Sequence, residues 1–436
     1  MIERIFSLDD MIGLPNHLVF REVDGNVLIL APEKPNWIVT NYTGREIINN
    51  LVESKTIRES MLIAAKKLQV SDEEIIEHTK KLLTDIEEYK FYESTQPIDL
   101  DESSPPTRLQ LYLTNRCNLR CVHCYMNSSE SLNNELSSEE WKNLIKDFNS
   151  IVGPTLVAFS GGEPLVLGKD FTRIAEFTKN KDNTTFLFTN GTLITKRNIE
   201  DLVNYMDKIQ VSIDGTTEEA HDSVRGDGSF RRTLKGLNLL RGKNVEVIIS
   251  YCVVPENIDD LRNNFIDFIE SLKIDDIKVG ISVARKIGRW KYNCQGCRDY
   301  SLGEFYHRLE DVLLEIYSRG WDTPSSNRNF IKRNCTFGQR FVVGAEGDVY
   351  PCAETVYNIG NVRKESTEIL YEKLKRINRD SSTDKTEVCS PCDLKYICRG
   401  GCKTARAQSY GTPFKQKCGE DRKELICKKL IGKTII

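Results

Sequence analysis

Short apolar runs alternate with helical patterns between residues 108 and 290. The runs of strand length are Gln110–Thr114, Leu156–Ser160, Thr185–Thr189, Ile209–Ile213, Val245–Tyr251 and Ile277–Val283. Helical stretches separate them, and one begins with the capping-box pattern Ser137-Ser138-Glu139-Glu140. Strands that alternate with helices predict a parallel sheet. Six such units are fewer than the eight of a closed barrel, so we predict an α/β fold with a partial (β/α)6 barrel.

Residues 1–95 follow a different pattern. The apolar runs Val19–Val23 and Val27–Leu30 are joined by Asp24-Gly25-Asn26, which predicts a β-hairpin. Helical patterns follow, with capping-box spacing at Thr43–Glu46 and at Ser71–Glu74. After the second, one helix face collects the apolar residues Ile75, Ile76, Leu82, Leu83 and Ile86. A hairpin with capped helices predicts a winged helix-turn-helix-like domain.

The chain of 436 residues is too long for one ordinary core. Prolines 97, 105 and 106 lie among acidic and serine residues and indicate a linker. We therefore expect several regions, with these boundaries: 1–95, the linker 96–107, the barrel 108–290, a bridging region 291–334 and a C-terminal domain 335–436.

The charge balance gives no reason to expect a nucleic acid or membrane partner. Lys and Arg number 61 against 64 Asp and Glu, a net charge of -3. Residues 1–95 hold 11 basic and 17 acidic residues, a net -6, which opposes DNA binding by the winged domain. Apolar runs such as Val247–Val254 are far shorter than the ~20 residues of a membrane span. No secretory signal is visible at the N-terminus, so a cytoplasmic location is expected.

Fourteen cysteines in a chain expected to be cytoplasmic indicate metal or redox chemistry, because a reducing compartment disfavours disulfides. Cys117, Cys121 and Cys124 follow the first barrel strand with C-x3-C-x2-C spacing, at the sheet edge where α/β proteins keep their chemistry. Three thiolates on one loop suit three irons of a 4Fe-4S cube and leave the fourth iron for another ligand. A zinc site that uses His123 is the alternative.

Polar and glycine residues end the next strands. Gly161-Gly162-Glu163-Pro164 follows the second strand, and Asn190 follows the third. Ser212 and Asp214 end the fourth, and Arg225 comes shortly after. Because carboxyl ends of parallel strands share one edge, these residues are expected to face one cavity. Each taken singly could also be a turn, a helix cap or a solvated charge.

The nonapeptide C-N-L-R-C-V-H-C-Y, from Cys117 to Tyr125, resembles the signature of radical S-adenosylmethionine (SAM) enzymes. The resemblance implies that SAM chelates the fourth iron through its amino and carboxylate groups. It also implies that Gly161, Gly162, Glu163 and Pro164 bind the methionine amino group. Ser212 and Asp214 are expected near the SAM ribose or carboxylate and Arg225 near the carboxylate, with Tyr125 and Asn190 among the cofactor-binding residues. Gly288-Arg289-Trp290 is similar to a turn of the same family, except at Trp290.

The C-terminal cysteines resemble those of SPASM domains in radical SAM peptide maturases. Their spacing is Cys335-x11-Gly347-x4-Cys352, then Cys389-x2-Cys392-x5-Cys398-x3-Cys402 and Cys418. The resemblance implies an outer auxiliary 4Fe-4S cluster on Cys389, Cys392, Cys398 and Cys418, and an inner one on Cys335, Cys352 and Cys402. The inner set lacks a fourth ligand, for which Cys294, Cys297, an open iron or, less readily, Cys427 are candidates. A zinc ribbon is the alternative.

Residues 1–95, and especially 37–91, resemble the peptide-recognition domain that heads many peptide-modifying radical SAM enzymes. That resemblance implies that an extended leader peptide adds to an exposed strand edge and packs against a helix. The whole chain most resembles the streptide-type maturases of streptococci. This resemblance implies three 4Fe-4S clusters and an electron donor such as flavodoxin or ferredoxin. It also implies a ribosomally synthesised precursor peptide as the substrate and a carbon–carbon cross-link between lysine and tryptophan.

Other functions stay open from the sequence. A thioether-forming maturase or an anaerobic sulfatase maturase would share most of the motifs. An iron-sulfur regulator that binds DNA through residues 1–95 is the alternative outside enzymes, and the -6 charge of that segment opposes it.

Overall fold

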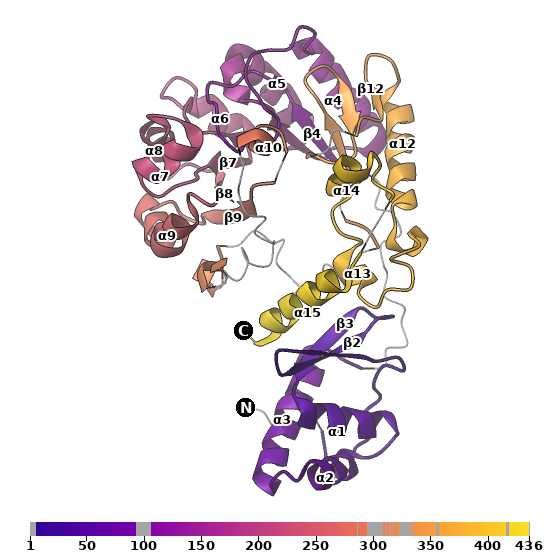
Figure 1. Ribbon diagram of the computed structural model, residues 1–436. Helices are drawn as coiled ribbons and strands as arrows, with labels where there is room; N and C mark the ends of the chain where they lie inside the picture. Colours follow the sequence, from indigo (N-terminus) through magenta and orange to yellow (C-terminus); the bar gives the residue numbers. More distant parts are fainter. Residues whose placement is uncertain are drawn as a thin grey trace.

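The computed structural model describes residues 6–92, 106–285 and 287–293, parts of 308–335, and residues 337–354, 357–415 and 418–435. These form an N-terminal unit, a curved parallel sheet with outer helices, and a cysteine-rich C-terminal region (Figure 1). Most of the predicted linker and both Cys294 and Cys297 lie outside the described residues. None of the helices in the described part has the length and apolar character that a bilayer span requires.

The N-terminal unit confirms the predicted hairpin. Its antiparallel sheet has the order β1-β2-β3, with bounds Val19–Val23, Asn26–Ala31 and Asn36–Thr40. Asp24 and Gly25 both have positive φ, 49° and 79°, as a tight two-residue hairpin turn requires. The helices that follow are α1 (Tyr42–Val52), α2 (Ile57–Leu68) and α3 (Asp72–Glu88).

Strand β3 was missing from the prediction because its residues do not alternate. Trp37, Ile38 and Val39 are all buried. Ile38 packs with the helices of the unit, whereas Trp37 and Val39 pack with helix α15 (Glu420–Ile435) of the C-terminal region. A strand covered on both faces carries no period-2 signal.

Two details of the predicted helices are corrected. Helix α1 begins two residues earlier than the pattern at Thr43 indicated, because the Asn41 side chain caps it by accepting from the Gly44 amide. Ile76 on α3 is 41% exposed and lies off the buried face. The predicted cap at Ser71 is confirmed, since its hydroxyl accepts from the Glu74 amide.

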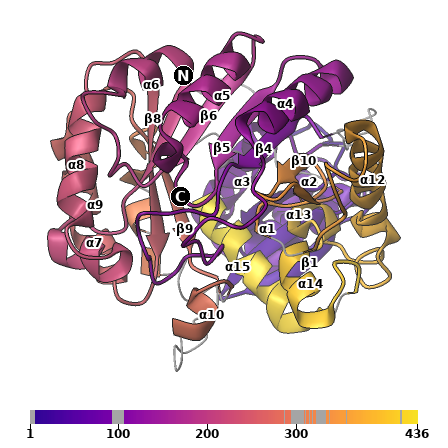
Figure 2. The same cartoon turned by 90° about the horizontal axis from the view of Figure 1, so that it is seen from above.

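The predicted partial barrel is confirmed. Neighbouring strands pair in parallel in chain order from β4 to β9. Their bounds are Arg108–Tyr112, Leu156–Ser160, Thr184–Thr189, Lys208–Ser212, Glu246–Val253 and Lys278–Val283. The outer helices in Figure 2 are α4 (Ser138–Val152), α5 (Lys169–Lys179), α6 (Ile199–Tyr205), α7 (Glu218–Arg225), α8 (Ser229–Leu240) and α9 (Ile258–Leu272). One core of aliphatic and aromatic side chains joins strands and helices.

The C-terminal region extends the same sheet. Strand β10 pairs in parallel with β4, and the order continues through β11 to β12. The remaining bounds are β10 Arg340–Val343, β11 Asp348–Tyr350, β12 Gly360–Asn361, α12 Thr367–Asp380, α13 Lys395–Cys398 and α14 Lys403–Tyr410. The short 3-10 helices are η1 (Pro164–Leu167) and η3 (Thr383–Lys385), and α10 (Trp290–Asn293) follows the barrel. The β10–β4 pairing fixes the C-terminal region beside the first barrel strand.

Candidate functional site

The cysteine loop leaves the carboxyl end of β4 and is held by backbone bonds. The Cys117 amide donates to the Ser129 carbonyl (2.9 Å), and the Val122 amide donates to the Val224 carbonyl (2.9 Å). The thiols of Cys117, Cys121 and Cys124 lie close enough to influence one another electrostatically. Burial raises the pKa of Cys121 to about 11, so this thiol needs a metal or a nearby cation to ionise.

The turn at Gly288 and Arg289 follows the last barrel strand, β9, and holds the cysteine loop in place. Arg289 donates through Nη1 to the Cys121 carbonyl (2.8 Å) and through Nη2 to the Ser128 carbonyl (2.7 Å). Gly288 has φ +55°, and an added Cβ would lie 2.3 Å from the Tyr125 carbonyl oxygen. Trp290 is buried with Val224, Val254 and Val122. The unusual tryptophan therefore packs beneath the cysteine loop.

A buried network connects the loop to β7. Asp214 is fully buried, and its Oδ2 accepts from Arg225 Nε (2.6 Å) and lies 3.3 Å from His123 Nε2. Its Oδ1 accepts from the Cys252 amide (2.7 Å). Burial alone would raise the pKa of Asp214, but the Arg225 and His123 charges and this amide keep it below its usual value. Arg225 Nη1 reaches to 4.0 Å from Cys121 Sγ, so the network ends at the cysteine.

The Gly-Gly-Glu-Pro turn packs directly against the chain that leaves β4. A Cβ added at Gly161 would lie 2.5 Å from the Thr114 carbonyl oxygen, and one at Gly162 would lie 2.1 Å from that of Arg116. Only glycine allows this approach. Pro164 starts η1, where a missing amide hydrogen costs nothing.

Glu163 ties two strand ends together. Its buried carboxylate accepts from the Leu165 amide (3.1 Å), the Thr189 hydroxyl (2.8 Å) and the Asn190 amide (2.7 Å). Burial raises the pKa of Glu163 to about 7, against the lowering effect of these three bonds. The sequence motif is thus also a brace between β5 and β6.

Asn118 was missed by the sequence reasoning although it lies inside the motif. It accepts from Asn190 Nδ2 (2.9 Å) and donates to the Thr192 hydroxyl (2.8 Å). The cysteine loop and the end of β6 are therefore joined by side-chain amides. No local pattern could have revealed this, since the partners are about seventy residues apart in the chain.

Tyr125 connects the cysteine loop to the C-terminal region through a chain of hydrogen bonds. Its hydroxyl donates to Tyr112 Oη (3.3 Å), and Tyr112 Oη donates to the Ala353 carbonyl beside Cys352. Ser212 is half-buried at the last position of β7. Strand ends, cysteine loop and the Cys352 segment thus gather at one edge of the sheet.

Five of the seven C-terminal cysteines predicted as ligands interact with one another electrostatically, as two separate sets. Electrostatic contacts connect Cys389 and Cys392 to Cys398, and Cys352 to Cys335. Cys402 Sγ accepts from Arg285 Nη1 (3.3 Å), whose partner Glu354 lies close to Cys352. Cys418 Sγ contacts the Gly419 carbonyl (3.8 Å). Buried Cys427 on α15 lies near Cys392.

The cysteine loop suits an iron-sulfur cluster better than a zinc ion bound with the help of His123. His123 Nε2 faces Asp214 instead of the thiols. Sets of thiols spread over one loop match the larger cuboidal cluster.

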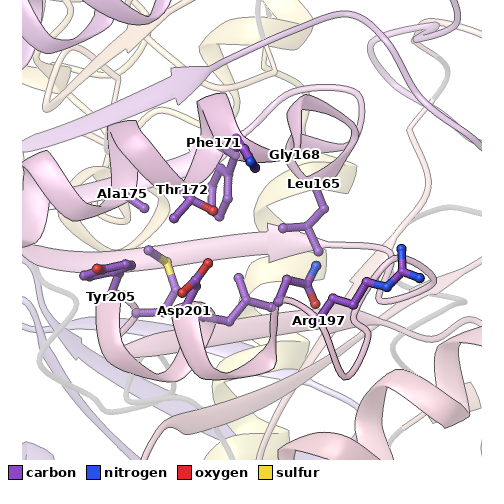
Figure 3. Close-up of a pocket in the computed structure, with 12 residues that line it drawn as sticks. Leu165, Gly168, Phe171, Thr172, Ala175, Arg197, Asp201 and Tyr205 are labelled. Atoms are coloured by element: carbon purple, nitrogen blue, oxygen red, sulfur yellow. The ribbon is translucent and has the colours of Figure 1, made fainter.

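A pocket of about 260 Å³ lies elsewhere, between α5 and α6 on the outside of the barrel (Figure 3). Its lining includes Phe171, Thr172, Leu202 and Tyr205. None of the cysteines or strand-end residues described above lines it, so it is separate from the candidate active site.

Comparison with protein families agrees with this geometry. Residues 111–269 match the radical SAM superfamily, and residues 335–393 match the SPASM iron-sulfur cluster-binding domain. These ranges contain the barrel core and the first four C-terminal cysteines of the SPASM pattern.

Several known proteins are similar to this chain. An AdoMet-dependent heme synthase of Methanosarcina barkeri is 29% identical over 339 residues, which are 71% of this chain and 93% of that protein. The subtilosin biosynthesis protein AlbA of Bacillus subtilis is 26% identical over 313 residues, 69% of this chain and 68% of that protein. Streptococcus suis SuiB, solved bound to precursor peptide SuiA, has 17% identity and a TM-score of 0.58, covering 94% of this chain and 99% of that chain.

The SuiB likeness establishes the shared fold. The radical SAM domain binds SAM and a 4Fe-4S cluster, and the SPASM domain binds iron-sulfur clusters. The chain is therefore a radical SAM enzyme that carries a SPASM domain after its partial barrel.

Proposed function

We propose that this enzyme modifies a ribosomally synthesised precursor peptide, forming an intramolecular carbon–carbon bond between a lysine and a tryptophan. The N-terminal unit is the observation that carries the proposal. The likeness to SuiB bound to its precursor peptide covers 94% of this chain, which leaves too few residues to omit this unit. The heme synthase match uses 93% of that protein yet only 71% of this chain.

The geometry of the unit supports leader binding along β3. Among the strands that the structure describes, β3 pairs only with β2, and α3 runs beside it in the opposite direction. Asn36 at one end donates to the Tyr89 carbonyl (2.7 Å), and Asn41 beyond the other end lies 3.1 Å from His78. An extended leader could add to this edge by main-chain hydrogen bonds and contact α3 with its side chains.

The chain's residues divide the work at the candidate site. Cys117, Cys121 and Cys124 would hold the cluster to which SAM binds, which supplies a 5'-deoxyadenosyl radical able to abstract hydrogen from an unactivated carbon. Gly161 to Pro164, Asn190, Ser212 and Arg225 would line the SAM site. Asp214 orients Arg225, and Trp290 packs on Val122 of the cysteine loop and supports it.

The proposed cross-link removes two hydrogens from the peptide. One leaves as a hydrogen atom, and the other leaves as a proton and an electron when the indole ring recovers its aromaticity. The electron requires an acceptor, for which the SPASM cysteines Cys335, Cys352, Cys389, Cys392, Cys398, Cys402 and Cys418 would hold auxiliary clusters. A flavodoxin or ferredoxin is proposed as the donor for SAM cleavage.

The product decides between the candidate bonds. The full-length enzyme is reduced anaerobically and given SAM and each short peptide encoded beside its gene as a candidate precursor. Tandem mass spectrometry and NMR then locate the linkage. A link between lysine and tryptophan carbons that forms in a cysteine-free substrate supports the proposal. A link lost when a substrate cysteine becomes alanine indicates a thioether, and SAM-dependent haem production without peptide turnover would favour the activity named for the Methanosarcina relative.

The assignment of the SAM-binding cluster has its own test. Replacing Cys117, Cys121 and Cys124 with alanine is expected to abolish 5'-deoxyadenosine formation. With three four-iron clusters, iron should fall from about twelve to about eight per chain. Anaerobic iron and sulfide analysis with Mössbauer spectroscopy measures this. Continued 5'-deoxyadenosine formation would exclude these cysteines, and stoichiometric zinc in the remaining sites would favour the ribbon alternative.

A further inference from the structure

Two cationic side chains are buried among the C-terminal cysteines. Lys403 is 1% exposed and Arg406 is 7% exposed, on the first turn of α14. Lysine and arginine are almost never this buried unless a negative charge compensates them. A negative charge close to these two cations is therefore needed to explain their burial.

The ammonium of Lys403 has little compensation from the protein itself. Its Nζ donates to the Arg399 carbonyl (3.0 Å), and no carboxylate in the described part of the chain pairs with it. Burial lowers the pKa of Lys403, whereas its charge interactions with Cys335, Cys389 and Cys398 act in the opposite direction. The groups that favour its charged form are thus cysteines from both proposed cluster sites.

Arg406 faces the same cysteines. It hydrogen-bonds the Cys389 side chain, interacts electrostatically with Cys335, and donates through Nη1 to the Pro413 carbonyl (3.4 Å). Its nearby charged neighbour Arg422 is also positive. A Cβ built on Gly400 would lie 3.0 Å from Lys403 Nζ and 3.2 Å from Arg406 Nη2, so both cations lie over this glycine.

We propose that Lys403 and Arg406 form a buried cationic pair that compensates the charge of the SPASM clusters and raises their reduction potential. A four-iron cluster held by thiolates gains a further negative charge when it takes up one electron. A fixed cation next to its ligands stabilises that reduced state. Both cations interact electrostatically with Cys335 of the proposed inner set and with Cys389 of the proposed outer set, so the pair can act on both clusters.

The pair would favour the electron transfer that the proposed reaction needs. After hydrogen abstraction and bond formation, the peptide radical loses one electron and one proton. The cluster gains that electron. This inference rests on the proposed ligand assignment of the C-terminal cysteines. It does not depend on which cross-link the enzyme forms in the substrate peptide. It treats Lys403 and Arg406 as residues that tune a potential, without contact to the substrate.

The test measures potential instead of turnover. Full-length protein with Cys117, Cys121 and Cys124 replaced by alanine is reconstituted, so that EPR-monitored redox titration reports only the SPASM clusters. Lys403→Met and Arg406→Gln are expected to lower the midpoint potential. Lys403→Arg and Arg406→Lys should keep the parent value, because they retain the charge. Lys375→Met on α12, where the lysine is 42% exposed and paired with Glu372, is the matched control and should not shift it.

The outcomes separate charge from packing. An unchanged potential in both neutral variants at full iron content overturns the proposal, as does an equal shift in the conservative variants. If the neutral variants lose iron while the conservative ones retain it, the cations are needed to hold the clusters, which supports charge compensation. Equal iron loss in both classes points to packing and overturns it. Full iron in Cys335→Ala and Cys389→Ala would instead refute the ligand assignment.

Discussion

At the scale of single residues, buried carboxylates hold the candidate site together. Asp214 restrains Arg225 and contacts His123 of the cysteine loop, and Glu163 joins the ends of β5 and β6. Both were expected to touch the cofactor, and the structure shows each one engaged by protein groups. Their contribution to a SAM site therefore includes positioning other groups.

Asp214→Asn is expected to destabilise the protein strongly. The substitution leaves Arg225 buried without its counter-charge, and breaking a buried pair this way costs about 3–5 kcal/mol. Anaerobic urea denaturation followed by circular dichroism measures the free energy of unfolding. Asp170→Asn removes an exposed pair with Arg173 and should cost less than about 1 kcal/mol. Similar losses in both variants would show that burial does not matter here.

Glu163 predicts a specific pH dependence. Its pKa is about 7 in the folded protein, above the ordinary value of 4.5, so the folded state binds this proton more tightly than the unfolded state. The resulting stability is complete below pH 4.5 and is lost as the pH rises through about 7. Glu163→Gln does not titrate, so the stability of the wild type relative to this variant should fall over that range, by up to about 3 kcal/mol. Denaturation curves at several pH values check this, and a difference constant with pH contradicts it.

At the scale of elements, side-chain caps fix where helices begin. Ser137 and Glu140 form a reciprocal capping box at the start of α4, as their spacing predicted. The Glu140 carboxylate also accepts two hydrogen bonds from Arg363. One runs from Nε to Oε1 (2.6 Å) and the other from Nη2 to Oε2 (3.0 Å). One residue therefore starts a barrel helix and attaches the C-terminal region to it.

Glu140→Gln is expected to cost about 1 kcal/mol at neutral pH, because both partners are partly exposed and solvent screens the pair. The Arg363 bonds lower the pKa of Glu140 to about 2, below its ordinary 4.5. Its stabilisation is therefore present above pH 4.5 and lost as the pH falls towards 2. Thermal unfolding at pH 7 and pH 3.5 should show the difference between wild type and variant shrinking. Glu139→Gln, which removes an exposed pair with Lys142, is the control.

At the scale of the whole molecule, α15 joins the two ends of the chain. Figure 1 shows α15 beside β2 and β3 of the N-terminal sheet. Leu430 and Ile431 of α15 belong to one buried cluster with Val23, Leu30 and Trp37 of that sheet. Arg21 of β1 donates to Asp393 (2.8 Å), the residue after Cys392. The proposed leader-binding unit therefore rests on the proposed outer-cluster loop.

Leu430→Asp is expected to separate the N-terminal unit from α15, because it places a charge in this apolar contact. Hydrogen exchange should then increase in β1 to β3, while SAM cleavage continues, since the barrel has its own core. Glu424→Gln, which removes only an exposed pair with Lys428 within α15, should leave exchange unchanged. Unaltered protection of the sheet in Leu430→Asp would show that the contact does not hold the unit in place.

The sequence by itself determined the parts whose signals are local. Strand β5 and the hairpin strand β1 match their predicted bounds, and the other barrel strands shift by at most two residues at either end. The caps at Ser71 and Ser137 and the cysteine loop followed in the same way. Periodicity, turn chemistry and thiol spacing act between neighbours in the chain, so they can be read without the fold.

Only the tertiary structure decided what distant segments do to one another. It buried β3 on both faces, joined β10 to β4, paired Asp214 with Arg225 beside Cys121, and enclosed Lys403 and Arg406 among the SPASM cysteines. An isolated lysine in a sequence reads as a surface charge, and alternation is absent from a strand with two covered faces. These properties depend on which surfaces meet after folding, and contacts between residues far apart in the chain leave no local pattern.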